Sequence, residues 1–264
     1  MPLELWTNII CPFAHRTLLA AKIRNPPEGV VEHHIPLTLE LTAANKVSMD
    51  PVVKVNSVWA GKSVEELNSI KDKYKELNPS GEVPTVVTAK GEAIFESEIS
   101  AEFMDAIGDP AGERLVPADP VEVAKMRLVM KRFGDTLGPC YQLLTNQDPA
   151  KDQELVTGIK AAMDKWAQSL APTGPYCLGD RLTLADVHVA PFLHRLQIAL
   201  RYWRGFDLLE GQARAAEIAA AVKALPAWSG TDLSQDQWEL VYEGYANQLK
   251  VEDGKWAGRG KSSL

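Results

Sequence analysis

The stretch IICPFAHRT, residues Ile9–Thr17, places a cysteine directly before a proline at the eleventh position of the chain. Before it, the apolar and β-forming residues around Trp6 to Ile10 predict a short strand that ends at Cys-Pro. After it, Phe13–Ile23 has apolar residues at helical spacing, and the sequence NPPEG ends this helix. The sequence VVEHHIPL then predicts a second strand. Strand, helix and strand in this order indicate a βαβ unit with a parallel pair of strands.

The next part of the chain contains three further readable segments. SVEELNSIKDKYKEL predicts a helix, because Ser63 and Glu66 have the spacing of a capping box. VPTVVTA and AIFE, separated by the turn KGE, predict an antiparallel hairpin, and SEISAEFMDAIG predicts a helix that ends at Gly108. The stretch from about Thr38 to Ser63 has no clear period. We interpret it as an insertion or a lid-like loop.

The C-terminal half reads as helical. GDPAGERLVPADP is rich in glycine and proline and predicts a linker. Helical spacing then recurs in 120–138, 154–170, 184–203 and 212–225. We therefore expect an α/β domain over 1–107, with the insertion around 38–63, and an all-helical domain over 108–264. The last residues are polar and glycine-rich, which predicts a mobile tail unless Trp256 docks.

The bulk composition excludes several classes of protein. The net charge of −7 argues against a general nucleic-acid binder and against anchoring on an anionic membrane. No apolar run approaches the roughly 20 residues that span a bilayer, and the N-terminus does not resemble a signal peptide. The three cysteines, Cys11, Cys140 and Cys177, are few and widely spaced, so we expect neither a disulfide framework nor a metal site. A reducing cytoplasm is the expected compartment.

Five motifs, in order along the chain, resemble those of the glutathione transferase superfamily. CPFAHR resembles the signature of its cysteine-type, omega-like members, and NPSGEVPTV resembles the segment leading into its cis-proline. FESEIS, CLGDRLTLADVHVAP and LPAWSG resemble later family motifs. The match covers most of residues 3–230 and fails over about Thr38–Ser63. The resemblance implies a thioredoxin-like N-terminal domain, an all-α C-terminal domain, glutathione as co-substrate and a homodimer.

Cys11 is the predicted catalytic residue. At the start of a helix, the unpaired amides and the helix dipole stabilise a thiolate and lower the pKa of a cysteine from about 8.5 to roughly 3.5–7.5. Pro12 suits the first turn because its missing N–H needs no partner there. Position 14 is alanine, so no second cysteine resolves a disulfide within the motif. Glutathione is the expected external thiol, and the alternative is a buried structural cysteine.

The resemblance also assigns residues that bind glutathione. It implies a cis bond between Val83 and Pro84 that presents backbone groups to the glutathione backbone; the alternative is a trans proline at a strand start. Ser97 is expected as the N-cap of its helix, binding the γ-glutamyl carboxylate together with the helix amides. Glu96 is expected to hold the γ-glutamyl ammonium group. Phe13 packs along glutathione or in the core.

Other residues near the motif are assigned less directly. Lys71, with Lys73 nearby, is the candidate cation for the glycyl carboxylate of glutathione, and the alternative is a solvated helix face. Arg16 is interpreted as structural or as a donor near the site. His15 lies on the same helix face as Cys11 and adds positive charge there, or else is a partly exposed histidine.

The helical domain contributes an acceptor pocket and a folding signal. Tyr141, Tyr202 and Trp203, with Phe206, are candidates for lining the acceptor pocket, although aromatic residues at helical spacing are more often core. Thr183 and Asp186 form a capping pair that we interpret as structural rather than catalytic. Cys140 and Cys177 have no motif around them and are interpreted as structural.

These assignments predict a glutathione-dependent thiol transferase or reductase. A Cys11–glutathione mixed disulfide would serve deglutathionylation or dehydroascorbate reduction, and conjugation to electrophiles is a weaker second activity. The alternative is a non-catalytic binding or scaffold module that has kept the fold, because fold alone does not determine function. A form that inserts into membranes is disfavoured by the lack of a continuous apolar segment near the N-terminus.

Overall fold

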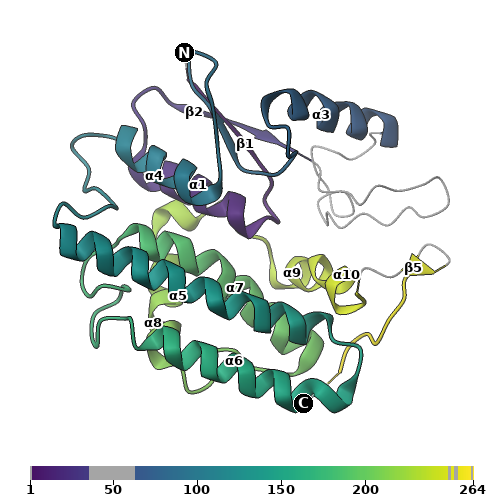
Figure 1. Ribbon diagram of the computed structural model, residues 1–264. Helices are drawn as coiled ribbons and strands as arrows, with labels where there is room; N and C mark the ends of the chain where they lie inside the picture. The colour runs from purple at the N-terminus through teal and green to yellow at the C-terminus, as the bar shows by residue number, and fades with distance from the viewer. Residues whose placement is uncertain (1, 36–62, 249–250, 253–254, 263) are drawn as a thin grey trace. The chain divides into compact units, whose positions relative to one another are not determined.

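The computed structural model describes residues 2–35, 63–248, 251–252, 255–262 and 264 (Figure 1). Nearly all of the predicted insertion at 38–63 lies outside these residues. The contacts of the chain define two compact units. The first contains the described residues up to Val116 and, from much later in the chain, Pro226–Asp232. The second contains Pro117–Leu225 and Leu233–Leu264.

The first unit is built on a four-stranded sheet. Its strands are β1 (Leu3–Thr7), β2 (Val30–His34), β3 (Thr85–Val87) and β4 (Ala93–Phe95), in the order β2-β1-β3-β4. Strands β1 and β2 are parallel, whereas β1–β3 and β3–β4 are antiparallel. The predicted βαβ unit and the predicted hairpin are therefore both confirmed.

The first strand ends earlier than expected. It was predicted to run to the Cys-Pro pair, but β1 stops at Thr7 and the chain turns over the next four residues. The turn is closed by Asn8: its side-chain Oδ1 accepts from the amide of Ile10 at 2.8 Å, and its carbonyl accepts from the amide of Cys11 at 3.1 Å. Such local bonds by an asparagine compete with strand pairing.

Three described helices cover the sheet: α1 (Pro12–Arg24), α3 (Val64–Leu77) and α4 (Ser97–Ile107). Helices α1 and α4 lie side by side, and α3 lies on the other side of the sheet (Figure 1). The side chains of β1 explain both layers, because Leu3, Leu5 and Thr7 are buried on one face while Trp6 points to the other. There the Trp6 ring stacks on Tyr74 of α3, with centroids 5.6 Å apart.

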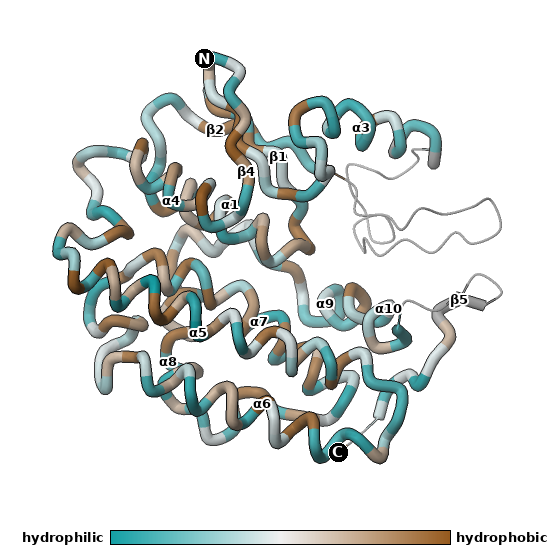
Figure 2. The backbone as a smooth tube through the Cα atoms, in the orientation of Figure 1, coloured by the Kyte–Doolittle hydropathy of each residue, from teal (hydrophilic) through white to brown (hydrophobic). Residues whose placement is uncertain are grey.

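Most residues of helix α3 are hydrophilic (Figure 2). It begins with the predicted capping box: the amide of Ser63 donates to Glu66 Oε2 at 2.6 Å, and the amide of Glu66 donates to Ser63 Oγ at 3.2 Å. Tyr74, only 1% exposed, packs with Ala14, Ile35 and Val83. Helix α3 is therefore amphipathic, with Tyr74 among the side chains that join it to the sheet.

The glycine- and proline-rich segment after α4 is held to the first unit up to Val116. The Asp105 carboxylate is fully buried and pairs with Nε of Arg24 at 3.0 Å. It also accepts hydrogen bonds from the amides of Leu115 at 2.7 Å and Val116 at 3.1 Å. A buried carboxylate with these partners fixes the segment that the sequence alone presented as a linker.

The second unit is mostly helical, but the prediction of an all-helical domain missed a short strand pair near residue 250. Its long helices are α5 (Pro120–Thr145), α6 (Asp152–Ala167), α7 (Leu184–Arg204) and α8 (Ala213–Lys223). Helix α7 is buried along most of its length and packs against α5, α8 and α9. The sequence did not predict α9 (Gln235–Val241) or α10 (Glu243–Ala246). The remaining described elements are η1 (Pro149–Lys151), η2 (Pro226–Trp228) of the first unit, and the short pair β5 (Val251–Glu252) and β6 (Lys255–Trp256).

Described residues of the C-terminal tail, which was expected to be mobile, make specific contacts. Arg259 forms a two-bonded ion pair with Asp152, with Nη1 at 2.8 Å from Oδ1. The fully buried Arg204 donates to six backbone carbonyls, including those of Ala246 at 2.6 Å and Gly260 at 2.8 Å. Burial lowers the pKa of Arg204 to about 10. These bonds tie the tail to α5, α6 and α7.

No helix among the described residues is long and apolar enough to cross a membrane.

Candidate functional site

Cys11 occupies the N-cap position of α1, as the sequence predicted for a reactive thiol. Its backbone is extended, with φ −80° and ψ 116°, and its carbonyl accepts from the amide of His15 at 3.0 Å. Pro12 is the first helical residue, and the first turn contains no acidic side chain. The thiol is partly exposed, with Sγ 3.9 Å from the carbonyl oxygen of Val83. The positive end of the helix dipole thus lies at this sulfur.

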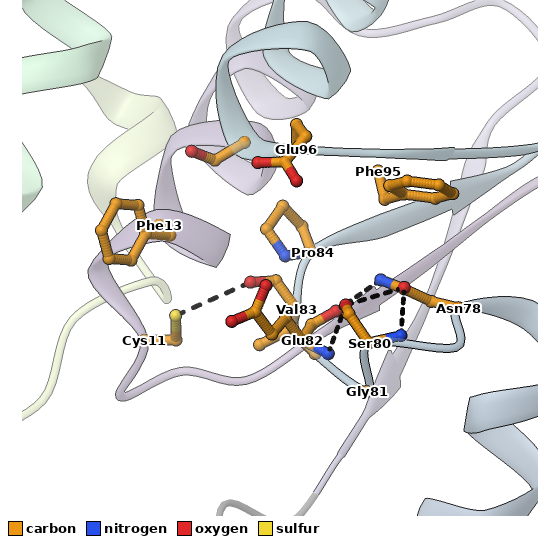
Figure 3. Close-up of a pocket in the computed structure, with 11 residues that line it drawn as sticks. Cys11, Phe13, Asn78, Ser80, Gly81, Glu82, Val83, Pro84, Phe95 and Glu96 are labelled. Atoms are coloured by element: carbon orange, nitrogen blue, oxygen red, sulfur yellow. Dashed lines mark hydrogen bonds between the residues drawn. The ribbon is translucent and has the colours of Figure 1, made fainter.

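The thiol opens into a cavity of about 390 Å³ within the first unit (Figure 3). The cavity brings together six predicted site residues, Cys11, Phe13, Val83, Pro84, Glu96 and Ser97, and the lining also includes Asn78, Ser80, Gly81, Glu82 and Phe95. The predicted residues come from the start of α1, the loop before β3, and the junction of β4 with α4.

The Val83–Pro84 peptide bond is cis, as predicted. Sequence reasoning missed the hydrogen bonds that hold this loop. The Tyr74 hydroxyl donates to the carbonyl of Glu82 at 2.6 Å and pairs with Thr85 Oγ1 at 2.7 Å, while Asn78 Nδ2 donates to the same carbonyl at 2.9 Å. Burial raises the pKa of the Tyr74 phenol, which keeps it protonated as a donor.

The start of α4 differs from the prediction. Ser97 was expected to be the N-cap, but it is already the first helical residue, and Glu96 is the cap. Glu96 has φ 69° and ψ 119°, a conformation that is rare for a residue with a side chain, and its side chain makes no capping hydrogen bond. The Ser97 hydroxyl instead accepts from Arg16 Nη1 at 3.2 Å. The first turn of α4 therefore borders the cavity without a side-chain cap.

Phe13 is exposed and Arg16 is buried, which is the reverse of what an apolar and a charged side chain suggest. Phe13 is 45% exposed at the cavity, whereas Arg16 is 3% exposed. The Arg16 guanidinium carbon lies 5.1 Å from the centroid of the Phe13 ring, which is a cation–π distance. Arg16 thus places a buried positive charge beside Ser97, consistent with a structural residue that also donates near the site.

His15 is not the partly exposed histidine that was favoured. Only 2% of it is exposed, and its Nε2 lies 2.8 Å from Thr231 Oγ1, with its ring 4.7 Å from that of Trp228. The correction has a simple cause: the segment Pro226–Asp232 returns to pack on α1. The motif LPAWSG, residues 225–230, covers most of this segment but ends before Thr231, and nothing in it indicates a contact with His15.

Lys71 and Lys73 lie on α3, and neither is among the described residues that line the cavity. The predicted contact between Lys71 and a glycyl carboxylate therefore remains a prediction. The described lining contains no lysine or arginine at all.

The predicted acceptor-pocket residues belong to the second unit. Tyr141 packs against Tyr245 at 5.7 Å, and Tyr202 packs edge-on against Trp203 at 5.0 Å, all between ring centroids. Trp203 Nε1 also donates to the carbonyl of Glu239 at 2.9 Å. These contacts hold the side chains inside their own unit, so an acceptor pocket made from them remains a prediction.

The other two cysteines have the environments expected of structural thiols. Cys140 is 1% exposed and Cys177 is fully buried. Burial raises the pKa of Cys140 to about 12 and that of Cys177 well above its ordinary value. Within the residues that the structure describes, no group of three or more His, Cys, Asp or Glu side chains is arranged to hold a metal ion.

A thioredoxin-like sheet followed by a helical unit is the arrangement of the glutathione transferase fold. Two family models match the chain: "Glutathione S-transferase, N-terminal domain" over 10–107 and "Glutathione S-transferase, C-terminal domain" over 124–229. The chain therefore belongs to the glutathione S-transferase family. The predicted family and fold, and an enzyme class at the level of the family, are confirmed.

Individual relatives are more distant. Glutathione S-transferase omega-1 of the pig, Sus scrofa, is 22% identical over 196 residues, covering 74% of this chain and 67% of the relative. A stringent starvation protein A homolog of Pasteurella multocida is 30% identical over 132 residues, covering 48% and 58%. The solved structure of glutathione transferase Omega 3C from Trametes versicolor gives a TM-score of 0.71 at 20% identity, covering 94% and 92%. The chain thus spans about two thirds or less of these curated relatives.

Proposed function

We propose that this protein is a glutathione-dependent thiol transferase of omega-like character that works through a Cys11–glutathione mixed disulfide. The observation that carries the proposal is the position of the Cys11 thiol. It is partly exposed at the N-cap of α1, with Sγ 3.9 Å from the Val83 carbonyl, in a cavity also lined by Glu96 and Ser97. Cys11 is the catalytic residue of the proposal.

Glutathione fits the polar groups of this cavity. The γ-glutamyl carboxylate binds the Ser97 hydroxyl and the first amides of α4, where the helix dipole favours an anion. The γ-glutamyl ammonium group pairs with the Glu96 carboxylate. The backbone of Val83 pairs with the middle of the tripeptide, as an extended peptide pairs with an exposed strand edge. This arrangement directs the glutathione sulfur toward Cys11.

The proposed reaction is a pair of thiol–disulfide exchanges. The Cys11 thiolate attacks the glutathione sulfur of a mixed disulfide R–S–S–G, forming Cys11–S–S–G while RS⁻ leaves and takes a proton from water. A second glutathione thiolate attacks the glutathionyl sulfur of this intermediate, so that oxidised glutathione leaves and the Cys11 thiolate returns. Ala14 stands where a resolving cysteine would be, which supports an external thiol for the second step.

The test is intact-protein mass spectrometry after incubation with oxidised glutathione, on the wild type and on Cys11→Ser. We expect one glutathione adduct on the wild type and none on the variant. The buried Cys140 and Cys177 are internal controls, because their thiols are protonated and inaccessible under native conditions. Peptide mapping should place the adduct on Cys11, and the pH dependence of the labelling rate gives the pKa of its thiol.

Turnover then separates the possible acceptors. Reduction of an S-glutathionylated peptide and of dehydroascorbate, both with glutathione, should fall at least a hundredfold in Cys11→Ser, since no other residue replaces the attacking sulfur. Conjugation of glutathione to an electrophile should be weaker in the wild type, because Cys11 competes with the glutathione sulfur. Full thiol-transfer activity in Cys11→Ser would show that the mechanism is wrong.

A non-catalytic binding module is the second candidate. It is favoured by the match to the stringent starvation protein A homolog, whose name states no transferase activity and whose identity to this chain, over a shorter stretch, exceeds that of the omega relative. An ordinary cysteine pKa together with no glutathione adduct would support this candidate. Retention of the thiol, Glu96 and Ser97 around one cavity favours the enzyme.

We also propose a homodimer in a reducing, cytoplasmic compartment. Exposed apolar side chains on the first unit, Phe95 at 43% and Ile99 at 58%, offer a surface for a second copy. The three cysteines are free, which agrees with a reducing environment. Light scattering on the purified protein measures the oligomeric state directly, and a monomer at micromolar concentration would contradict the dimer.

A further inference from the structure

The cavity beside Cys11 has an acidic lining. Its described lining residues include two carboxylates, Glu82 and Glu96, and none of them is lysine, arginine or histidine. The proposed pairing with a γ-glutamyl ammonium group accounts for Glu96. The same pairing gives Glu82 no role. The negative charge of Glu82 is also unfavourable here, because glutathione carries two carboxylates of its own.

The backbone of Glu82 is held in place. Its carbonyl accepts from the Tyr74 hydroxyl at 2.6 Å and from Asn78 Nδ2 at 2.9 Å, and its amide donates to Ser80 Oγ at 3.2 Å. Tyr74 is 1% exposed and Asn78 is 2% exposed, so both partners of the Glu82 carbonyl are buried, whereas Ser80, the partner of its amide, is exposed. The side chain of Glu82 is exposed, and Glu82 is one of the residues that line the cavity. Its carboxylate is therefore attached to a backbone that these hydrogen bonds hold at the edge of the cavity.

Glu82 and Glu96 lie toward opposite ends of the lining. In Figure 3, Pro84 stands between Glu96 on one side and Ser80 to Glu82 on the other. The proposed function places the γ-glutamyl end of glutathione at Glu96 and Ser97, and its middle residue at Val83. The glycyl end then lies, by elimination, on the side formed by Ser80, Gly81 and Glu82.

We propose that Glu82 is a specificity-determining residue that selects against a free carboxylate at the glycyl end of the ligand. The inference rests on the proposed function, since it needs glutathione in that orientation. The favoured ligands are glutathione derivatives in which the glycyl carboxylate is an amide or carries an amine. An amide removes the repulsion of two carboxylates, and an amine adds an attraction to Glu82.

The expected effect is moderate. Two unit charges about 4 Å apart in water interact by roughly 1 kcal/mol, which corresponds to about a fivefold change in affinity. Because the Glu82 side chain is exposed, added salt should reduce the effect. A salt dependence separates charge repulsion from a steric effect of the same side chain.

The experiment compares two ligands by calorimetry: S-methylglutathione and the same compound with its glycyl carboxylate converted to an amide. The methyl group prevents disulfide formation, so the measurement does not depend on turnover. Wild type should bind the amide about fivefold more tightly than the acid, and Glu82→Gln should bring the ratio near one by strengthening binding of the acid. Glu92→Gln is the matched control, because Glu92 is an exposed carboxylate of the same unit that does not line the cavity.

The outcomes are distinct. A preference for the amide that Glu82→Gln removes, Glu92→Gln keeps and high salt weakens would support the proposal. Equal binding of the two ligands to the wild type, or an unchanged ratio in Glu82→Gln, would overturn it while leaving the proposed function intact. Failure of both ligands to bind would overturn the proposed function and this proposal together. Loss of the mixed disulfide in Cys11→Ser is measured separately and tests the proposed function alone.

Discussion

Helices α4 and α7 begin in opposite ways. At α7, Asp186 accepts hydrogen bonds from the amides of Thr183 at 2.8 Å and Cys177 at 2.6 Å, and from the Thr183 hydroxyl at 2.9 Å. Asp186 is fully buried, and a capping box closes the helix. At α4, Glu96 has a positive φ and makes no side-chain cap, and the first turn borders the cavity beside Cys11.

The difference separates a helix start that serves folding from one that we propose serves binding. At α7, the carboxylate of Asp186 and the hydroxyl of Thr183 are bonded within the protein, so these side chains close the helix start from inside the fold. Helix α4 has the same dipole, but its N-terminus borders a cavity and has no side-chain cap. The positive φ of Glu96 at this position is energetically unfavourable for a residue with a side chain. Sequence alone shows both as a serine or threonine near an acidic residue, and only the geometry distinguishes them.

Removing the carboxylate that closes the start of α7 should have the largest effect on the free energy of unfolding. Asp186→Ala leaves the amides of Thr183 and Cys177 without their buried acceptor, so we expect the free energy of unfolding to fall by about 3 kcal/mol. Chemical denaturation measures the loss. Asp180→Ala is the control, because Asp180 is exposed nearby, and it should change stability by less than about 0.5 kcal/mol. Equal losses in the two variants would contradict the assignment of α7.

A substitution at the uncapped start of α4 should change ligand affinity more than it changes the stability of the fold. Ser97→Ala removes a hydrogen bond to the proposed γ-glutamyl carboxylate, and we expect S-methylglutathione to bind about tenfold more weakly, as for a hydrogen bond to a charged group. Ser234→Ala removes a side-chain cap of α9, and should cost about 1 kcal/mol of stability without changing ligand affinity. Calorimetry and denaturation on both variants test the contrast. Unchanged affinity in Ser97→Ala would remove α4 from the binding site.

A third helix start should give a small, pH-dependent effect. Asp152 is the first residue of α6, and its hydrogen bond to Arg259 lowers its pKa below the ordinary value of 3.8. The unfolded chain binds this proton more tightly than the folded protein does. The stabilisation is therefore complete above the unfolded pKa and is lost as the pH falls through the lower, folded value.

We expect roughly 1 kcal/mol from this pair, measured as the difference in unfolding free energy between wild type and Asp152→Asn at pH 6, shrinking as the pH falls below 3.8. A difference that stays constant down to acid pH would show that the asparagine changes packing rather than charge pairing.

Local chemistry explains what the sequence predicted well. The capping boxes at Ser63 and Thr183, the hairpin before α4 and the start of α1 at Pro12 all depend on residues within a few positions of one another. Six of the predicted site residues meet in one cavity because motifs of this family mark loops that a small sheet brings together.

Long-range contacts explain what it missed. The burial of His15 depends on Thr231, 216 positions later, and the anchoring of the tail depends on Arg259 reaching Asp152. Tyr74, which lies within a predicted helix, was assigned no role from the sequence, although its hydroxyl donates to the carbonyl of Glu82 and so holds the loop before β3. Contacts between residues far apart in the chain produce no periodic pattern in the sequence. The identity of one side chain does not indicate which distant group it contacts.

The return of Pro226–Asp232 to α1 has a consequence for the order in which the chain becomes complete. When the first 116 residues have been synthesised, every strand of the main sheet and Cys11 are present. Trp228 and Thr231, which pack on His15 of α1, have not yet been made. The helix that carries the thiol therefore completes its packing only after Trp228 and Thr231 have been synthesised. During synthesis, the final packing around α1 therefore follows the synthesis of Pro117–Leu225, which belongs to the second unit.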